Sequence, residues 1–355
     1  MRILHILNHI QEIGNGIVNV AIDLACLQAK AGHEVSVASA GGEYEELLSR
    51  YGAKHFKLDQ TRKPINLLKA ASLYRTTVQA FKPDIVHAHM MTGVVLARLL
   101  RANTRYGLVS TVHNEFQRSA VLMGWADRVI AVSHAVAKSM ERRGIPPTQL
   151  RVICNGTVGS PRSRPLNEYQ PLLLQRPAIT TVAGMYQRKG ITELIEAFAQ
   201  IAADFPDSHL YIVGNGPDRE LFEAQAKNTA VCDRIHFEGF QPEPQRYLLS
   251  TDIFVLASHR EPFGLVLSEA RETGCAIIAS DVDGIPEAVA GGQAGLLVPP
   301  ADSKALATAL TQLLSDSHIL QKWKDQAQHN LEELNVVRVH QETLAVYKEL
   351  IANSK

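Results

Sequence analysis

Two carboxylates in the C-terminal third could bind the hydroxyl groups of a ligand. Glu261 and Glu269 stand eight positions apart and follow an apolar strand that we predict over 253–257. Glu269 falls on a helix predicted over 265–273, which Gly274 ends. A helix start offers N–H groups and a positive dipole end to an anion, and carboxylates accept hydrogen bonds from hydroxyls. The run indicates a nucleotide-sugar pocket, although two exposed acids on a helix would give the same pattern.

A basic pair could supply the phosphate contacts. Arg188 and Lys189 immediately precede a helix predicted over 190–204. Two cations at a helix start oppose the helix dipole, and this cost is explained if a diphosphate binds there. Arg188 would then contribute a fork of donors and Lys189 a point charge. The alternative is a solvated basic turn.

Glycine-rich turns follow two of the predicted strands. Gly214 and Gly216 come after a strand predicted over 209–213, and Gly16 opens a helix predicted over 16–31. Glycine lets the backbone approach a phosphate or a base closely. Ordinary strand-to-helix turns are equally consistent with these residues.

Polar residues at the ends of other strands are weaker candidates. His113 ends a strand predicted over 107–112, where it could contact a sugar hydroxyl or move a proton. His89 is a second candidate of this kind, although a lone histidine is more often structural. Asp281 and Asp283 resemble a metal-binding pair but lie in a glycine-containing turn, so we predict a loop and no metal site.

Strands and helices alternate along the whole chain. This alternation predicts an α/β fold with two doubly wound parallel sheets. Four prolines interrupt the pattern within 157–177 and indicate a linker. We therefore predict one Rossmann-like domain over 1–160, a linker over 161–177, a second Rossmann-like domain over 178–335 and a closing helix over 336–355.

Charge is unevenly divided between the two halves. Residues 1–165 hold 21 Lys and Arg against 11 Asp and Glu, whereas residues 166–355 hold 15 against 25. This asymmetry favours an anionic partner for the first half, or reflects surface drift with no partner. No apolar run is long enough to span a membrane. Four scattered cysteines suggest reduced thiols and a cytoplasmic protein.

Taken together, the motifs resemble a known family. The chain is similar over nearly its whole length to the GT-B glycosyltransferases of family GT4, which are retaining enzymes that use nucleotide-sugar donors. The motifs that carry the resemblance in the first half are Gly32-His33-Glu34-Val35, Pro83-Asp84-Ile85-Val86-His87-Ala88-His89, Val112-His113, Ala131-Val132-Ser133 and Asn155-Gly156. In the second half they are Arg188-Lys189-Gly190, Gly214-Asn215-Gly216-Pro217, the Glu261 to Glu269 run and Gly284-Ile285-Pro286-Glu287. The chain departs from the family pattern at Asn15, where a glycine is common, and at Met185, where an arginine is common.

The resemblance implies roles for the charged candidates. Lys189 and Arg188 would bind the donor diphosphate and stabilise the leaving charge. Glu261 would lie beside the donor sugar, and Glu269 would hold the ribose hydroxyls. His113 would contact the donor sugar near the reacting centre.

It also implies backbone contacts to the donor. The N–H groups of Phe263, Gly264 and Leu265 would reach the sugar and phosphate. Gly214 and Gly216 would line the nucleotide, and Gly16 would approach the diphosphate from the first domain. The two domains would face each other across a cleft, the first binding the acceptor and the second the nucleotide sugar.

The expected activity is transfer of a hexose, with a UDP-sugar favoured, to a glycan or lipid-linked acceptor in cell-envelope or exopolysaccharide biosynthesis. No metal and no cofactor are expected. The sequence leaves open a sugar-nucleotide epimerase of similar fold and a non-enzymatic protein that binds an anionic ligand. We expect no nucleic-acid partner, because few aromatic residues accompany the basic ones.

The basic first domain could hold the protein on the cytoplasmic face of an anionic inner membrane. The residues concerned lie before and within an amphipathic helix predicted over 65–81, and they are Lys54, Lys57, Arg62, Lys63, Lys69 and Arg75. An ordinary solvated helix is the alternative. We expect the helix over 336–351 to pack back on the first domain.

Overall fold

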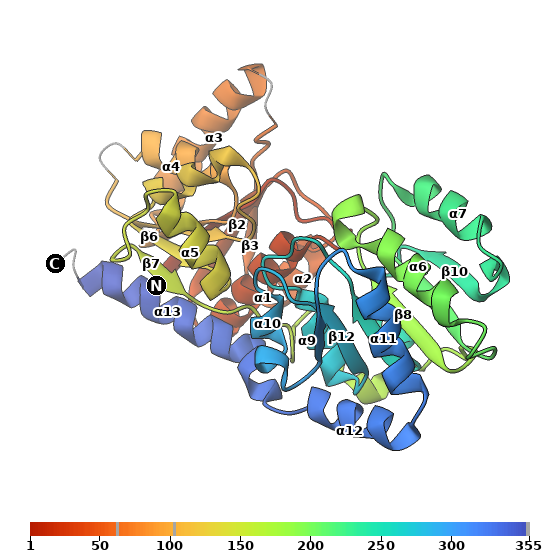
Figure 1. The fold of residues 1–355 in the computed structure, drawn as a ribbon. Coiled ribbons are helices and arrows are strands. Elements are labelled where there is room, and N and C mark those ends of the chain that lie inside the picture. The colour runs from red at the N-terminus through yellow and green to blue at the C-terminus, as the bar shows by residue number, and fades with distance from the viewer. Residues whose placement is uncertain (62–63, 102–103, 353–355) are drawn as a thin grey trace. The chain divides into compact units, whose positions relative to one another are not determined.

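The computed structural model describes residues 1–61, 64–101 and 104–352, which form two compact units (Figure 1). The first unit consists of Met1–Asn155, Gly159–Ser163 and Asn335–Lys355. The second consists of Gly156–Val158 and Arg164–Leu334. Each unit is built around its own parallel sheet, so the predicted α/β class is confirmed.

The first unit contains a seven-stranded sheet in the order β3-β2-β1-β4-β5-β6-β7. Its strands are β1 (Arg2–Ile6), β2 (Glu34–Ser39), β3 (Lys54–Lys57), β4 (Ile85–Ala88), β5 (Gly107–Val112), β6 (Arg128–Ala131) and β7 (Leu150–Val152). Its α-helices are α1 (Gly16–Lys30), α2 (Glu45–Arg50), α3 (Pro64–Phe81), α4 (Met91–Leu99), α5 (His134–Arg142) and α13 (Val336–Ala352). The strand order reverses between β1 and β4, which creates a switch point where open α/β sheets bind ligands.

The second unit contains a six-stranded sheet in the order β10-β9-β8-β11-β12-β13. Its strands are β8 (Ala178–Val182), β9 (His209–Val213), β10 (Ile235–Gly239), β11 (Ile253–Leu256), β12 (Ala276–Ser280) and β13 (Leu296–Val298). Its α-helices are α6 (Ile191–Ile201), α7 (Arg219–Lys227), α8 (Gln245–Leu248), α9 (Leu265–Glu272), α10 (Ile285–Ala288), α11 (Ser303–Leu314) and α12 (Ser317–Ala327). Its switch point lies between β8 and β11.

Helix α6 shows how the sequence covers this second sheet. Its apolar residues recur every three or four positions, which places them on one stripe. Leu194, Phe198 and Ile201 on this stripe are at most 3% exposed and pack in the same core as Leu310 of α11. Burial of this stripe fixes the helix over the sheet and holds the loop that precedes it.

The chain returns to the first unit at its end. Helix α13 contacts α1 and β5, and its Tyr347 is fully buried. Glu349 of the same helix accepts hydrogen bonds from Arg128 and Arg151, at 3.3 and 3.1 Å from their Nε atoms. These contacts, together with the buried apolar stripe of α13, make the closing helix a structural part of the first unit (Figure 1).

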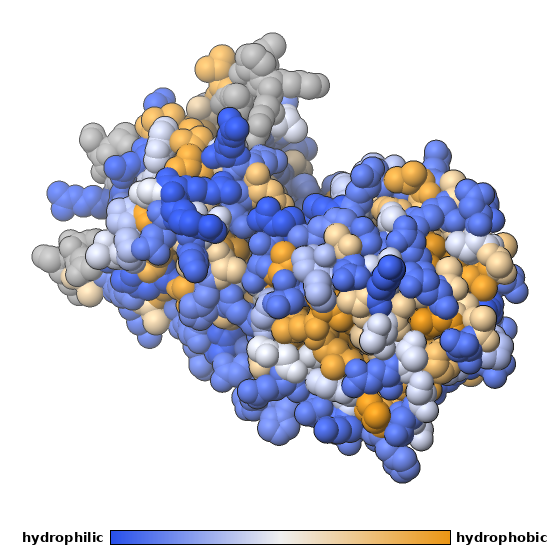
Figure 2. All heavy atoms as spheres, viewed as in Figure 1, coloured by the Kyte–Doolittle hydropathy of each residue, from blue (hydrophilic) through white to orange (hydrophobic). Residues whose placement is uncertain are grey.

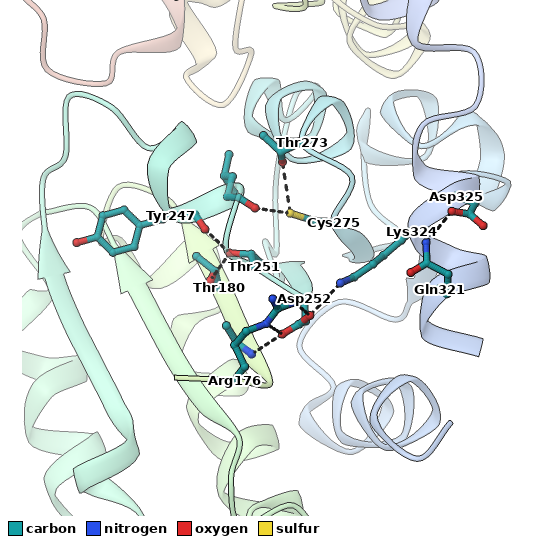
Figure 3. A network of polar contacts seen from close by, with 12 residues as sticks. Arg176, Thr180, Tyr247, Thr251, Asp252, Thr273, Cys275, Gln321, Lys324 and Asp325 are labelled. Carbon is teal, nitrogen blue, oxygen red and sulfur yellow. Dashed lines mark hydrogen bonds and ion pairs between the residues drawn. The ribbon is translucent and has the colours of Figure 1, made fainter. Parts of the chain in front are cut away.

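A buried carboxylate ties the amino ends of the two central strands of the second unit (Figure 3). Asp252 is 5% exposed and accepts hydrogen bonds from Arg176 Nε at 3.0 Å, the N–H of Ala178 at 2.9 Å and Lys324 Nζ at 2.9 Å. Burial is the largest single effect and raises the pKa of this carboxyl, but the hydrogen bonds from Arg176, Lys324 and the N–H of Ala178, together with the charge of Lys324, outweigh it and lower the pKa to about 2. Asp252 thereby links β8, β11 and α12.

Replacing Asp252 by Asn should therefore destabilise the second unit. The depression of the pKa from 3.8 to about 2 corresponds to about 2 kcal/mol at neutral pH, present above the unfolded pKa and lost as the pH falls through 4 towards 2. The loss of unfolding free energy would be measured by urea unfolding, followed by the fluorescence of Trp323, which packs against this core. A Trp125→Phe background leaves Trp323 as the single tryptophan of the sequence. Equal stability of Asp252→Asn and the parent protein at neutral pH would contradict the expectation.

Candidate active site

Three neighbouring strands of the second unit bring their carboxyl-end loops together. The N–H of Met185, after β8, donates to the carbonyl of Asn215, after β9, at 3.0 Å. The N–H of His259, after β11, donates to the carbonyl of Arg188, after β8, at 2.8 Å. These loops lie at the β8/β11 switch point, which is the expected position of a ligand site in such a sheet.

Two of the predicted glycines allow this close approach. Gly214 has a φ of 136°, and a Cβ atom there would lie 1.9 Å from the carbonyl oxygen of Ala183. A Cβ atom at Gly216 would lie 2.4 Å from the carbonyl oxygen of Met185. Both glycines are thus required for packing of the β9 loop against the β8 loop, whether or not they also approach a nucleotide.

Lys189 and Glu261 form an ion pair between the β8 and β11 loops. The two side chains are only 15% and 12% exposed, so water screens the pair weakly. Ser258 Oγ lies 3.4 Å from the same carboxylate oxygen. The structure therefore brings together a cation and a carboxylate that the sequence separates by more than seventy positions.

Asp283 fixes the backbone that carries Glu261. Its carboxylate, in the loop after β12, accepts the N–H of Glu261 at 3.0 Å and Nε of Arg260 at 2.7 Å. The N–H of Gly284 returns a bond to the carbonyl of Glu261 at 3.1 Å. Asp283 is thus a hydrogen-bonding residue of the loop, and no pattern in the sequence indicates its contact with Glu261.

Replacing Asp283 by Ala should lower kcat by roughly 10- to 100-fold, because small misplacements of site groups have effects of this size. Asp283→Asn keeps an acceptor and tolerates the left-handed φ of 47°, so it should retain most of the activity. Steady-state assays of both variants would test this. An equal loss of activity in Asp283→Ala and Asp283→Asn would show that the negative charge of Asp283, rather than its hydrogen bond to the Glu261 backbone, supports activity.

Helix α9 begins at this site, as the sequence indicates. Gly264 is its N-cap residue with a φ of 87°, and Leu267 is the residue whose N–H bonds back to the Gly264 carbonyl at 2.9 Å. The N–H groups of Leu265 and Val266 come before the first hydrogen bond of the helix, so they have no partner within the helix itself. Phe263 is 2% exposed and anchors the loop, while Glu269 lies half-buried on α9.

Arg188 is oriented differently from Lys189. Its side chain is exposed, and the guanidinium lies 5.3 Å from the ring centroid of Tyr186. Lys189 is a cation that pairs with Glu261. Arg188 would have to leave the ring of Tyr186 to act as a second cation on a ligand.

In the first unit, His113 and the start of α1 border a cavity of about 220 Å³. Its lining includes Asn8, Ile17, His89, Met90, Thr111, His113 and Gln117. Gly16 opens α1, and Asn15 caps that helix by accepting the N–H of Ile17 at 3.0 Å. Asn15 therefore performs a structural task in this turn.

His113 is uncharged at neutral pH. Burial lowers the pKa of its imidazole to about 3, which makes it a poor base at neutral pH and suits it to hydrogen bonding with a hydroxyl. Its Nε2 lies 3.1 Å from Nδ1 of His89. The sequence pointed to both histidines but not to the residues that lie behind them.

Family models match both halves of the chain. Residues 14–158 match the model described as Glycosyltransferase Family 4, and residues 168–330 match the model described as Glycosyl transferases group 1. Between them the two models cover most of the chain. The protein belongs to the family 4 glycosyltransferases.

Relatives and solved structures agree with this assignment. The chain is 27% identical to a phosphatidyl-myo-inositol mannosyltransferase of Mycolicibacterium smegmatis, over 98% of this chain and 94% of the relative. It is 24% identical to an N-acetyl-alpha-D-glucosaminyl L-malate synthase of Bacillus anthracis, over 96% and 95%. The structure of HepE from Anabaena with UDP and glucose superposes with a TM-score of 0.83 at 21% identity, over 98% and 99% of the two chains. The last likeness shows a shared GT-B fold.

Proposed function

We propose that this glycosyltransferase transfers a hexose from a nucleotide sugar, with a UDP-sugar favoured, to a glycan or lipid-linked acceptor of the cell envelope or of an exopolysaccharide. The Lys189–Glu261 pair at the β8/β11 switch point carries the proposal. The printed activities of the relatives support it, and HepE provides a precedent for UDP and glucose in a chain of this fold. The domain over 178–335 would bind the donor, and the domain over 1–160 the acceptor.

The residues of the second unit would act on the two ends of the donor. Lys189 would exchange its contact with Glu261 for the diphosphate and stabilise the charge that develops on the leaving group. Glu261 would then accept bonds from sugar hydroxyls, and Glu269 from the ribose. The first N–H groups of α9 would bind the remaining phosphate oxygens.

The reaction would retain the anomeric configuration and require no metal. In this scheme the cations Lys189 and Arg188 and the start of α9 provide the positive charge that a metal would otherwise supply. The leaving phosphate would take the acceptor's proton on the same face of the sugar. His113 would contact a donor hydroxyl near that centre.

The first unit would also hold the enzyme on the cytoplasmic face of an anionic membrane. Lys54, Lys57, Lys69 and Arg75 are exposed, whereas Arg62 and Lys63 lie outside the described residues. Leu68 and Leu73 of α3 are 75% and 47% exposed, and Figure 2 shows apolar residues among hydrophilic ones in this region. Among the described helices, none combines the length and apolarity needed to cross a membrane. Salt-reversible binding to anionic vesicles would test the contact.

Release of nucleotide from UDP-, GDP- and ADP-sugars in the presence of EDTA would test the proposed activity. We expect turnover of one donor, unaffected by EDTA and lost in Glu269→Ala. Glu196→Ala, which removes an exposed carboxylate from α6, is the matched control and should remain active. If no donor is turned over and calorimetry detects no binding, the proposal is wrong.

A further inference from the structure

A chain of buried hydrogen bonds runs inward from His113 in the first unit. Nε2 of His113 lies 3.1 Å from Nδ1 of His89, and Nε2 of His89 lies 2.9 Å from Nδ1 of His5. Nε2 of His5 lies 2.7 Å from Oε1 of Gln28. His5 and Gln28 are fully buried and His89 is 2% exposed. Strand β1, the residues just after β4 and β5, and helix α1 thus contribute to one continuous chain.

Gln28 also anchors a second branch. Its Nε2 donates to the hydroxyl of Tyr347 at 3.3 Å. That hydroxyl lies 2.5 Å from Nδ1 of His87, whose Nε2 lies 2.7 Å from Oγ1 of Thr111. Because the amide nitrogen of Gln28 already donates to Tyr347, the hydroxyl proton is left to bond His87. The structure thus places Oε1 of the Gln28 amide toward His5 and Nε2 toward Tyr347.

A metal site is the competing interpretation of this cluster. His5, His87 and His89 each have a nitrogen within 4.8 Å of the others. Both ring nitrogens of all three histidines, however, already have hydrogen-bond partners, as their distances show. A bound cation would have to break these bonds, so the cluster fits a hydrogen-bond relay better.

The orientation of Gln28 determines the tautomers along the chain. Burial lowers the pKa of His5 to about 4 and holds that of His89 well below its ordinary value, so these rings are neutral with one donor and one acceptor each. Since Oε1 of Gln28 only accepts, the proton of His5 is on Nε2 and its Nδ1 accepts from His89. His89 in turn carries its proton on Nε2 and accepts from Nε2–H of His113.

We propose that Gln28, acting through His5 and His89, fixes His113 in the tautomer that presents an unprotonated Nδ1 to the cavity, where it accepts a bond from a ligand hydroxyl. Among the described residues, Nδ1 of His113 has no hydrogen-bond partner. Gln28, His5 and His89 are positioning residues for His113. The ligand role of His113 rests on the proposed function, whereas the tautomer does not.

The relay can be read by NMR on the ligand-free full chain. A two-bond proton–nitrogen correlation on protein with isotope-labelled histidine distinguishes the tautomers, and loss of signals in His113→Asn assigns the ring. We expect the wild-type His113 proton on Nε2 at neutral pH. Gln28→Met removes the acceptor of His5, and leaving a buried N–H without a partner is costly. The proton of each ring should therefore move, and His113 should then carry it on Nδ1.

Controls separate this effect from a general loss of packing. Tyr74→Phe removes another buried hydroxyl of the first unit, which bonds Tyr106 at 2.8 Å, and it should leave the histidine signals unchanged. Addition of zinc alone should also change nothing, because no ring nitrogen of the cluster is available. A zinc-induced change at His5 and His87 would overturn the relay in favour of a metal site.

Two readouts keep this proposal distinct from the activity. If wild-type His113 carries its proton on Nδ1, or if Gln28→Met leaves its tautomer unchanged, the relay is wrong even if a donor is turned over. If the tautomers are as expected and no nucleotide sugar is bound, the relay stands and the proposed function falls. In an active enzyme, Gln28→Met should raise the donor KM by roughly two- to tenfold, the equivalent of one neutral hydrogen bond.

Discussion

Replacing Lys189 by Met is expected to lower kcat by roughly 10²- to 10³-fold, the usual effect of removing one charge that stabilises a transition state. The ammonium lies in a pair with Glu261 that is shielded from water, so its charge would act on the proposed diphosphate with little screening. The methionine side chain keeps much of the volume of lysine but has no positive charge to stabilise the negative leaving group. Single-turnover release of nucleotide, with donor binding measured by calorimetry, would separate chemistry from affinity.

Lys324 offers a matched control for this experiment. It also pairs with a buried carboxylate of the second unit, Asp252, but at the amino ends of the strands and so away from the proposed site. Lys324→Met should lose stability while its kcat is maintained. Lys189→Met leaves the Glu261 carboxylate without the cation it pairs with. The double variant Lys189→Met, Glu261→Gln removes that charge, so it should be more stable than Lys189→Met but no more active. Near-normal turnover in Lys189→Met would remove Lys189 from the mechanism.

The central strands could be predicted because they are continuous apolar runs. The strands predicted over 107–112, 209–213 and 253–257 match β5, β9 and β11 to within one residue. It missed β3, β7 and β13, which lie at edges of the two sheets. Lys54–Lys57 begins and ends with exposed lysines, and β7 and β13 have only three residues each. Such short strands carry little periodicity and form because a neighbouring strand offers hydrogen-bonding groups.

The candidate site was predictable only in its residue types. The helix start at Gly264 and the basic turn at Lys189 are visible as local patterns, because loop glycines and charges stand out from apolar strands. The partnership of Lys189 with Glu261, and that of Asp283 with the Glu261 backbone, depends on strand order. Gln28 resembles any other polar residue on a helix, and only the fold shows that its side chain is buried against His5.

Acidification to about pH 5 is expected to destabilise the first unit before the second. Burial lowers the folded-state pKa of His5 to about 4 and that of His113 to about 3, whereas the unfolded chain takes up each proton at about 6.5. The stability contribution of these neutral histidines is therefore fully present above pH 6.5 and is lost as the pH drops towards 4. At pH 5 each of these histidines costs about 2 kcal/mol, and the pKa shifts of His87 and His89 act in the same direction.

Hydrogen exchange resolved by peptide would measure both units in one sample. Protection of β1 and β4 should fall between neutral pH and pH 5, after correction for the intrinsic exchange rate, while that of β8 and β11 should be maintained. The second unit is spared because Asp252, with a pKa of about 2, loses its contribution only below about pH 4. His5→Gln keeps one donor and one acceptor without a titrating group, so it should reduce the acid sensitivity. His318→Gln, at an exposed position of α12, should not. An equal loss of protection in both units would place the acid-sensitive groups outside the histidine cluster.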